Sequence, residues 1–344
     1  MSRGMVFLLI QGIALVAIGV HGVLGLGGVN GADACIGFGG LSLLIVLAAL
    51  GRREHQAAGN SLWTDAWRRL RKNRMAVACG LVWYAVFLFS FAGPTVARAV
   101  AGLDGLTLDV DLGAAPPSLE HWMGTDPLGR DMMVRIMEGG QWAIWAGLTA
   151  TAVALVIGVA WGAVAGYMGG KTDEVMMRIV DVLYAFPTVV FVIVIMAVFE
   201  TVSLVVLFAL IGAISWLNMA RIVRGQVLSL RHREFVEAAH SIGATTPRIL
   251  ARHIVPNTLG PVIVYSTLAL PSVMLTEAFL SFLGLGVQAP RASWGTLVTE
   301  GASQIAVNPW TLIFPGLIMG ITIFALNFLG DGLRDALDPQ MRKD

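Results

Sequence analysis

Long apolar stretches without charged residues recur along this 344-residue chain and constrain its fold more than any other feature. A helix that spans a bilayer needs about 20 consecutive apolar residues. The apolar stretches of this chain are too continuous for the strands of an outer-membrane barrel, in which apolar and polar residues alternate over about 10 positions. The pattern predicts an all-α polytopic membrane protein with about eight transmembrane helices: Met5–Leu26, Ala34–Leu50, Met75–Val96, Trp142–Met168, Val175–Phe199, Val202–Leu217, Leu259–Leu280 and Trp310–Leu329.

The composition agrees with a membrane protein. Hydrophobic residues make up 56% of the chain and charged residues 13%, against about 25% charged in ordinary soluble domains. A soluble domain of this composition would lack the polar surface to cover itself. This excludes most soluble enzymes, disordered proteins and nucleic-acid binders. Cys35 and Cys79 both lie in apolar runs, so neither a disulfide framework nor a metal site is predicted.

The basic residues are distributed unevenly among the loops. Residues 51–74 contain seven Lys or Arg residues and residues 221–258 contain six, whereas 97–141 contain three and 287–309 contain one. Loops rich in Lys and Arg stay in the cytoplasm. The distribution therefore predicts that both termini are cytoplasmic, and that 97–141 is an outer loop.

The N-terminal region is predicted to form a transmembrane hairpin over residues 1–50, followed by a cytoplasmic segment over 51–74. A secretory signal peptide is the alternative for the first stretch, although the apolar run is long and a second one follows closely. In Ser61–Arg74 one helical face is apolar and the rest is basic, which is typical of a helix lying in the membrane interface. This helix is either an elbow against a partner subunit or a simple anchor.

Ionisable residues inside the predicted spans are scarce: His21, Asp181 and Glu277. Such residues often line transport pathways. Glu277 is predicted to line a translocation cavity, to cap a re-entrant segment, or to form structural hydrogen bonds. Glycines at positions 158, 162 and 166 predict a closely packed helix pair, within the chain or with a partner.

Gly169-Gly-Lys-Thr172 looks like the end of a phosphate-binding loop, but that motif needs a glycine where Ala165 stands, and the site follows a membrane span. No nucleotide site is predicted in this chain. If ATP drives it, another polypeptide binds the ATP.

The basic segment 221–258 has a clear local pattern. Residues Glu234–Ile242 favour a helix, and Gly243 is placed to end it in a left-handed conformation. Thr246 is predicted to cap a second helix that has Pro247 at its first position and ends at Pro256. A short, rigid helix–turn–helix between two spans suits contact with a cytoplasmic partner.

These residues also carry a family resemblance. Glu237-Ala238-Ala239, Gly243 and the segment ending at Pro256 resemble the "EAA" motif of permease subunits of bacterial ABC importers, with Val255 where that family usually has Leu. The chain from Leu62 onward is similar to the C-type subunit of the oligopeptide, dipeptide and nickel permeases. Further stretches that resemble it are Gly124–Asp131, Gly166–Pro187 and Ala278–Gln288 with Trp294.

The resemblance implies a six-helix type I importer permease core within residues 75–344, in the bacterial inner membrane, with 97–141 periplasmic and 221–258 as the coupling loop. It implies that the loop docks on an ATPase subunit through Glu237, Ala238, Ala239, Gly243 and Pro256, and that the permease moves by alternating access. The implied partners are a second homologous permease, two ATP-binding cassette subunits that hold ATP and magnesium, a periplasmic or lipid-anchored binding protein, and membrane lipid. The outer residues Asp126, Arg130 and Asp131 either contact the binding protein or form a turn leading into a helix.

The hairpin 1–50 departs from the six-span pattern, and no functional motif marks it. The resemblance implies short peptides as the substrate, and specificity is expected to reside largely in the binding protein, because no residue of this chain dictates the cargo. Nickel or another small solute is the alternative within the family, and a secondary transporter or channel is the alternative outside it.

Overall fold

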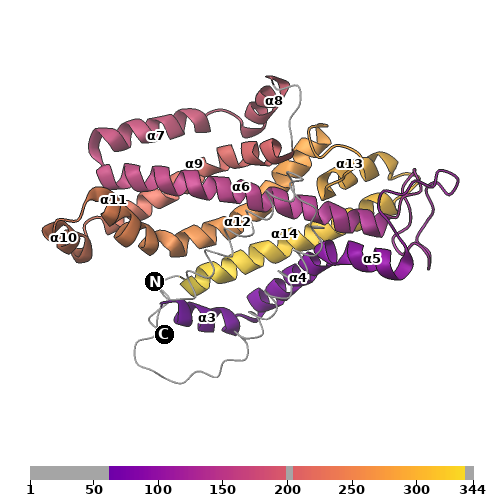
Figure 1. Cartoon of the computed structure of the whole chain (residues 1–344), viewed down its shortest axis with the longest axis horizontal. Helices are drawn as coiled ribbons and strands as arrows, with labels where there is room; N and C mark the ends of the chain where they lie inside the picture. Colours follow the sequence, from indigo (N-terminus) through magenta and orange to yellow (C-terminus); the bar gives the residue numbers. More distant parts are fainter. Residues whose placement is uncertain (1–61, 199–203, 338–344) are drawn as a thin grey trace. The chain divides into compact units, whose positions relative to one another are not determined.

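A computed structural model describes residues 62–198 and 204–337, and the regular elements of these residues are all helices (Figure 1). They are α3 (Leu62–Lys72), α4 (Arg74–Phe91), α5 (Gly93–Ala101), α6 (Met132–Met168), α7 (Gly170–Tyr184), α8 (Thr188–Val198), α9 (Leu204–Leu230), α10 (Glu234–Ser241), α11 (Thr246–Ile249), the π-helical turn η1 (Leu250–Ile254), α12 (Val255–Phe282), α13 (Trp294–Gln304) and α14 (Trp310–Leu337). The all-α prediction is confirmed.

Five helices are long and apolar enough to cross a membrane, or six if one bent pair counts as a single span. The five are Arg74–Phe91, Met132–Met168, Val206–Leu230, Thr246–Phe282 and Trp310–Leu337. The two predicted spans of the hairpin 1–50 lie outside the described residues. The count of eight is therefore not confirmed, whereas each of the other six predicted spans has a counterpart.

The bent pair replaces the straight span predicted over Val175–Phe199. Here Gly170–Tyr184 and Val189–Val198 meet at 83°. Pro187 lies in the break; it has no N–H to donate, and it disfavours the helical conformation of the residue before it. A prediction from uncharged apolar stretches does not detect this break, because the residues on both sides of it are apolar.

Several other helices are longer than the predicted apolar stretches. α6 begins at Met132 rather than at Trp142, and α9 continues to Leu230 rather than ending at Leu217. The additional turns carry charged residues that are paired within the chain, such as Arg135 and Arg224. The charges end the apolar stretch without ending the helix.

The described residues divide into two compact units. One contains Val77–Ala146 and Met274–Leu326, and the other contains Ala66–Ala76, Gly147–Val273 and the chain from Asn327 onward. The first unit includes α13, whose N-cap residue Ser293 forms a capping box with Thr296. The indole of Trp294 is fully buried, and its N–H donates to the carbonyl of Ile136 at 2.8 Å.

The second unit contains the predicted glycine-mediated contact, and the partner is α9 of the same chain. A Cβ on Gly158 would lie 2.6 Å from Cβ of Met219, and one on Gly166 would lie 2.9 Å from the carbonyl oxygen of Arg224. Real Cβ contacts are not this short, so only glycine permits the approach. The alternative left open by the sequence, packing against a partner protein, is not needed to explain these glycines.

The amphipathic helix predicted in Ser61–Arg74 is present as α3. Its Ala66 is buried and Trp67 is exposed. Asn73 separates it from α4 and accepts a hydrogen bond from the backbone N–H of Ala76 at 3.1 Å, which begins the next helix as a side-chain cap does.

Candidate functional site

The predicted coupling helix is present as α10, and its faces differ sharply in exposure. Val236 and Ala239 are buried at 1% and 3% relative exposure, and they pack in a core with residues of α6, α9 and α12. Glu237 and Ala238 are exposed. The EAA residues therefore divide: Ala239 fixes α10 to its own chain, while Glu237 and Ala238 are free to meet another molecule.

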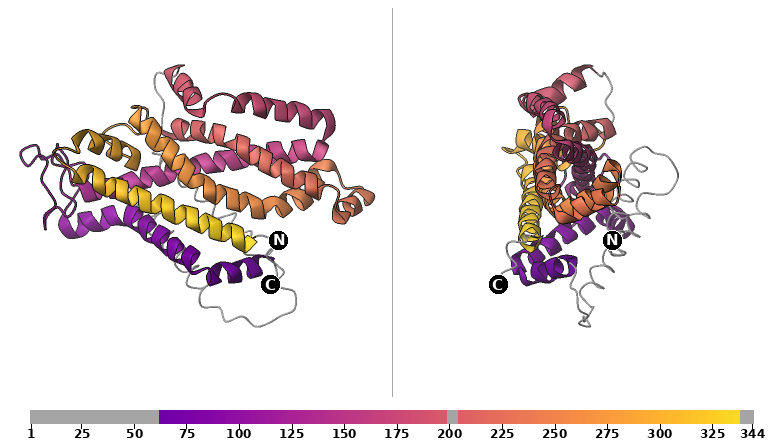
Figure 2. Two further views of the ribbon diagram at one scale, coloured as in Figure 1. Left: turned by 180° about the vertical axis from the view of Figure 1, so that it is seen from behind. Right: turned by 90° about the vertical axis from the view of Figure 1, so that its left-hand side faces the viewer.

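The exposed face of α10 is partly apolar. Phe235 and Ile242 are 38% and 84% exposed, beside Ala238. The left view of Figure 2 shows α10 and α11 as an orange elbow extending past the end of α9. Exposed apolar residues gathered on a projecting turn are typical of a protein contact surface.

Gly243 ends α10 as predicted, with φ of +78°. The N–H of Gly243 donates to the carbonyl of His240 at 2.9 Å, and the N–H of Ala244 donates to the carbonyl of Ala239 at 3.0 Å. This pair of bonds is a Schellman motif. A Cβ at Gly243 would meet nothing within 4 Å, so glycine is required here for its backbone conformation and not for space.

The second helix differs from the prediction at both ends. Its N-cap position is Thr245, not Thr246, and no side chain caps it. It does not stop at Pro256 but continues through η1 into α12. The predicted cap at Thr246 and the predicted break at Pro256 are therefore both wrong. The predicted coupling role of Pro256 stays a prediction.

The π-helical turn explains how Pro256 enters the helix. In η1 the N–H of Val255 bonds to the carbonyl of Leu250, five residues back. The side-chain amide of Asn257 donates to the carbonyl of His253 at 2.6 Å, and the Thr258 hydroxyl donates to that of Val255 at 2.9 Å. Pro256 itself donates no backbone hydrogen bond, and these two side-chain bonds are further contacts within the same turn. As a result, α11, η1 and α12 form one continuous helix from the predicted coupling loop into a candidate spanning segment.

A second connection holds α10 to a spanning helix. The hydroxyl of Tyr167, near the end of α6, lies 2.7 Å from Nε2 of His240. The guanidinium of Arg231 donates from Nη1 to the carbonyl of Gly166 at 3.2 Å, beside Tyr167. Nothing in the sequence marks Tyr167 and His240 as partners, because 73 positions separate them.

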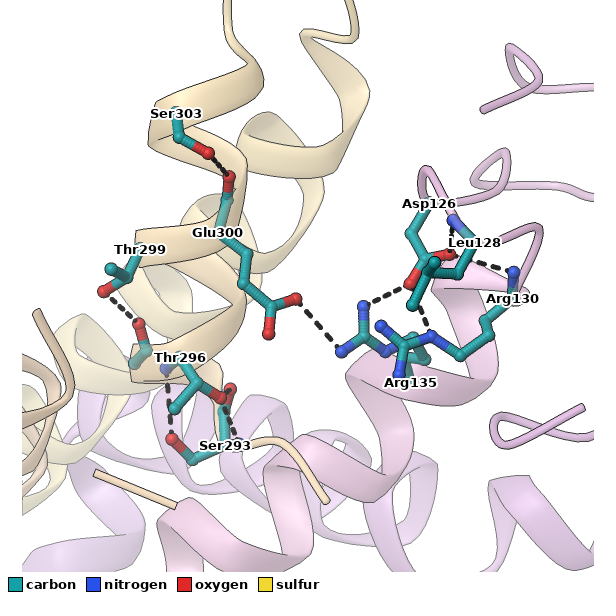
Figure 3. A network of polar contacts seen from close by, with 10 residues as sticks. Asp126, Leu128, Arg130, Arg135, Ser293, Thr296, Thr299, Glu300 and Ser303 are labelled. Carbon is teal, nitrogen blue, oxygen red and sulfur yellow. Dashed lines mark hydrogen bonds and ion pairs between the residues drawn. The ribbon is translucent and has the colours of Figure 1, made fainter. Parts of the chain in front are cut away.

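Two of the residues predicted to contact a binding protein, Asp126 and Arg130, belong to an internal network (Figure 3). Asp126 is buried, and its Oδ2 accepts from Nε of Arg130 at 2.7 Å and from Nη1 of Arg135 at 2.6 Å. Arg135 also donates to Glu300 of α13 at 3.0 Å. Asp131 is buried and accepts from the backbone N–H of Val134 at 2.9 Å, at the start of α6.

These contacts give Asp126 and Asp131 a structural role at the start of α6, in agreement with the turn that was the alternative. Beside them lies a cavity of about 370 Å³, whose lining includes Arg130, Arg291 and Glu300. Contact with a binding protein stays a prediction.

The sequence did not predict a role for Glu300, because no local pattern marks it as the partner of Arg135.

Glu277 is buried at 1% exposure in α12. One carboxylate oxygen accepts from the hydroxyl of Ser281 at 2.8 Å and from that of Ser293 at 2.6 Å. Gly295 brings the start of α13 close, because a Cβ there would lie 2.9 Å from Oε2 of Glu277. The contacts are those of the structural hydrogen-bonding alternative, with Glu277 placed at the N-terminus of α13, where a carboxylate is favourable.

Comparison with known proteins agrees with this architecture. Residues 158–343 match the family described as binding-protein-dependent transport system inner membrane component. Residues 61–104 match the N-terminal TM domain of oligopeptide transport permease C.

Curated relatives match over most of their length. The oligopeptide transport system permease protein of Bacillus subtilis (strain 168) is 45% identical, with 82% of this chain and 91% of that protein covered. Its counterpart in Escherichia coli (strain K12) is 46% identical over 83% and 94%. The dipeptide transport system permease protein of B. subtilis is 43% identical over 81% and 86%.

Among solved structures, a chain of the MetNI methionine ABC transporter in an inward-facing conformation aligns with a TM-score of 0.44 and 16% identity, covering 60% of this chain and 98% of that one.

The chain belongs to the family of binding-protein-dependent transport system inner membrane components. It is a multi-pass inner-membrane permease subunit of an ABC importer, and the ATPase activity of such importers is on partner subunits. The resemblance read from its motifs is confirmed.

Proposed function

We propose that this permease carries short peptides across the bacterial inner membrane, driven by ATP hydrolysis on partner subunits. The names of its relatives, which include oligopeptide and dipeptide permease proteins, support a peptide substrate. The complete transporter would contain a second homologous permease, two ATP-binding cassette subunits that hold ATP and magnesium, and a binding protein on the periplasmic side. Both termini lie in the cytoplasm.

The exposed face of α10 carries the proposal for coupling. Glu237 offers a charge, Ala238 permits close approach, and the Schellman turn at Gly243 holds both in a fixed orientation. This face would dock on an ATP-binding subunit. The cytoplasmic loop 221–258 would then be the coupling element, with its first ten residues part of α9.

The continuous helix α11–η1–α12 supports alternating access as the mechanism. A displacement of the coupling loop passes directly into α12, because no flexible break separates them. A helix transmits axial force along its whole length, whereas a loop would absorb it. ATP-driven closure of the two ATPase subunits would in this way move a spanning helix and open the pathway to the other side.

The test is a reconstituted transporter with its binding protein, in which peptide uptake and ATP hydrolysis are measured together. Glu237→Ala and Ala238→Trp should reduce peptide uptake and the ATPase stimulation by the binding protein, since one removes a charge from the contact and the other blocks close approach. Glu174→Ala, an exposed charge on α7, is the matched control and should leave both unchanged.

Normal uptake by both Glu237→Ala and Ala238→Trp in assembled complexes would overturn the coupling role. Binding-protein-dependent uptake of a metal ion and not of a peptide would overturn the proposed substrate class.

A further inference from the structure

Most of the basic residues in the two predicted outer loops line one cavity. These loops contain four arginines and no lysine. Three of the four, Arg130, Arg135 and Arg291, line the cavity of about 370 Å³ beside the start of α6, together with Asp126 and Glu300. All five residues belong to the first compact unit. Three positive charges against two negative charges leave the lining with a net charge of +1, which one further carboxylate would neutralise.

The acids of the lining leave the Arg130 guanidinium only partly bonded. Asp126 accepts four hydrogen bonds, from the backbone N–H groups of Leu128 and Arg130 and from the side chains of Arg130 and Arg135. A carboxylate has about four lone-pair sites, so Asp126 has no free acceptor. Arg130 uses only Nε in this contact, and its two terminal nitrogens have no partner among the described residues (Figure 3).

Arg291 has no carboxylate partner among the residues that the structure describes. Its side chain is exposed, and its guanidinium carbon lies 4.8 Å from the centroid of the Trp142 ring. This cation–π contact holds the charge in place but does not use the N–H donors of the guanidinium. Arg130 and Arg291 therefore offer hydrogen-bond donors to an anion that the described part of the chain does not supply.

Four exposed apolar residues lie beside these charges. They are Pro127, Leu128, Ala289 and Pro290, and Leu128 is 44% exposed. Exposed apolar residues outside the membrane favour contact with a protein. An arginine surrounded by apolar contacts that exclude water is typical of the residues that dominate binding in protein interfaces. A side chain on a protein surface fits this site better than a free small anion, because the protein also covers the apolar residues.

The charge of the cavity indicates what kind of protein binds there. Permanent interfaces are depleted of charged residues at their cores, so unpaired arginines are unsuited to the permanent contact between two permeases. Opposite charges instead speed the encounter of partners that bind and leave again. On the periplasmic side, the transporter proposed above has one such partner, its binding protein.

We propose that this cavity receives a carboxylate side chain of the periplasmic binding protein, with Arg130 and Arg291 as its hydrogen-bond donors. Asp126 does not touch the partner but holds Arg130 and Arg135 in position. An aspartate or glutamate of the binding protein neutralises the lining, and hydrogen bonds between charged groups are stronger than neutral ones. The inference rests on the proposed function and adds the residues of this chain, and the chemical group of the partner, that make the contact.

The experiment uses the complete transporter in nanodiscs together with its binding protein. Arg291→Lys keeps the positive charge and introduces the only primary amine of the two predicted outer loops, since they contain no lysine. A water-soluble carbodiimide joins a lysine amine to a carboxylate in contact with it, and mass spectrometry of the digested complex identifies both residues. Arg98→Lys is the matched control, because Arg98 lies in an outer loop, has a side chain 65% exposed and does not line the cavity.

Arg291→Lys should crosslink to an aspartate or glutamate of the binding protein, and Arg98→Lys should not. Arg291→Glu should raise the dissociation constant of the binding protein roughly tenfold or more, because it brings like charges together, whereas Arg98→Glu should leave this constant unchanged. Changing the crosslinked acid of the binding protein to lysine should restore the affinity for the Arg291→Glu transporter.

An assembled transporter that binds its binding protein but gives no crosslink to it from Arg291→Lys would overturn the proposal, as would a crosslink only to the second permease. So would equal dissociation constants for the unmodified and Arg291→Glu transporters. Binding-protein-dependent peptide uptake by the unmodified transporter is measured separately. Its absence would count against the proposed function itself, whatever the crosslinks show.

Discussion

Tyr167 of α6 and His240 of α10 are joined by a hydrogen bond of 2.7 Å between the phenol oxygen and Nε2, with their rings within 9° of parallel. The contact ties α10 to the end of α6, a helix long and apolar enough to span the membrane. Together with the buried Val236 and Ala239, it makes α10 part of the membrane domain and not a loosely attached loop. Force applied to α10 therefore reaches α6 as well as α12.

Replacing Tyr167 with phenylalanine removes this hydrogen bond and keeps the ring. A typical hydrogen bond contributes about 1 kcal/mol, so we expect the complex to assemble but to hydrolyse more ATP per peptide transported. The ratio of ATPase rate to uptake rate in proteoliposomes measures this. Ser241→Ala removes a hydroxyl that bonds only within α10 and should leave the ratio unchanged. An unaltered ratio in Tyr167→Phe would show that the contact does not contribute to coupling.

Replacing Gly243 with alanine should loosen the turn of the coupling loop. An L-residue in the left-handed conformation costs about 1 kcal/mol, which corresponds to a roughly fivefold change in a local opening equilibrium. Amide hydrogen exchange at Ala244, whose N–H bonds to Ala239, should accelerate accordingly. Gly225→Ala is the control, because a Cβ there meets nothing within 4 Å on a regular helix. Equal exchange in both variants would contradict the role of the positive φ.

Replacing Gly162 with alanine should destabilise the packing of α6 on α9. The added Cβ would lie 2.9 Å from Cβ of Val223 and close to the carbonyl oxygen of Ala220, which cannot move aside. Overpacking of this kind costs about 1–3 kcal/mol. The midpoint of thermal unfolding in detergent should fall, whereas Gly320→Ala, where the Cβ meets open space, should leave it unchanged. A midpoint preserved in Gly162→Ala would show that the two helices separate without loss of stability.

Replacing Glu277 with alanine leaves the hydroxyls of Ser281 and Ser293 without their acceptor in a buried site. An unsatisfied buried polar group costs about 1–3 kcal/mol. Amides in α13 should exchange faster in Glu277→Ala, and Glu277→Gln should restore much of the protection because its carbonyl oxygen still accepts. Identical protection in the alanine variant would argue against a role for Glu277 in holding α13.

The features predicted correctly depend on neighbours in sequence. Glycine following a short amphipathic helix defines the turn at Gly243, and the alternation of apolar and basic positions defines α3. The long uncharged stretches indicate where the spanning helices lie, because a helix must be long and apolar to cross the bilayer.

The features missed depend on residues far apart in sequence. In the first turn of α6, before the apolar stretch begins, Arg135 pairs with Glu300, 165 positions away. The helix passes through Pro256 next to the widened turn η1, which the sequence did not predict. No pattern in a single segment reveals such pairs, because the partner's position is set by the tertiary fold.

The central claim is that the exposed face of α10 docks on an ATP-binding subunit. A photo-crosslinking amino acid placed at Ala238 tests it most directly in the intact transporter, with the exposed Ser303 of α13 as the control position. The account predicts a crosslink from position 238 to an ATP-binding subunit, whose yield changes when ATP is added, and none from position 303. An active, assembled transporter that gives no crosslink from position 238 to either ATP-binding subunit would contradict it.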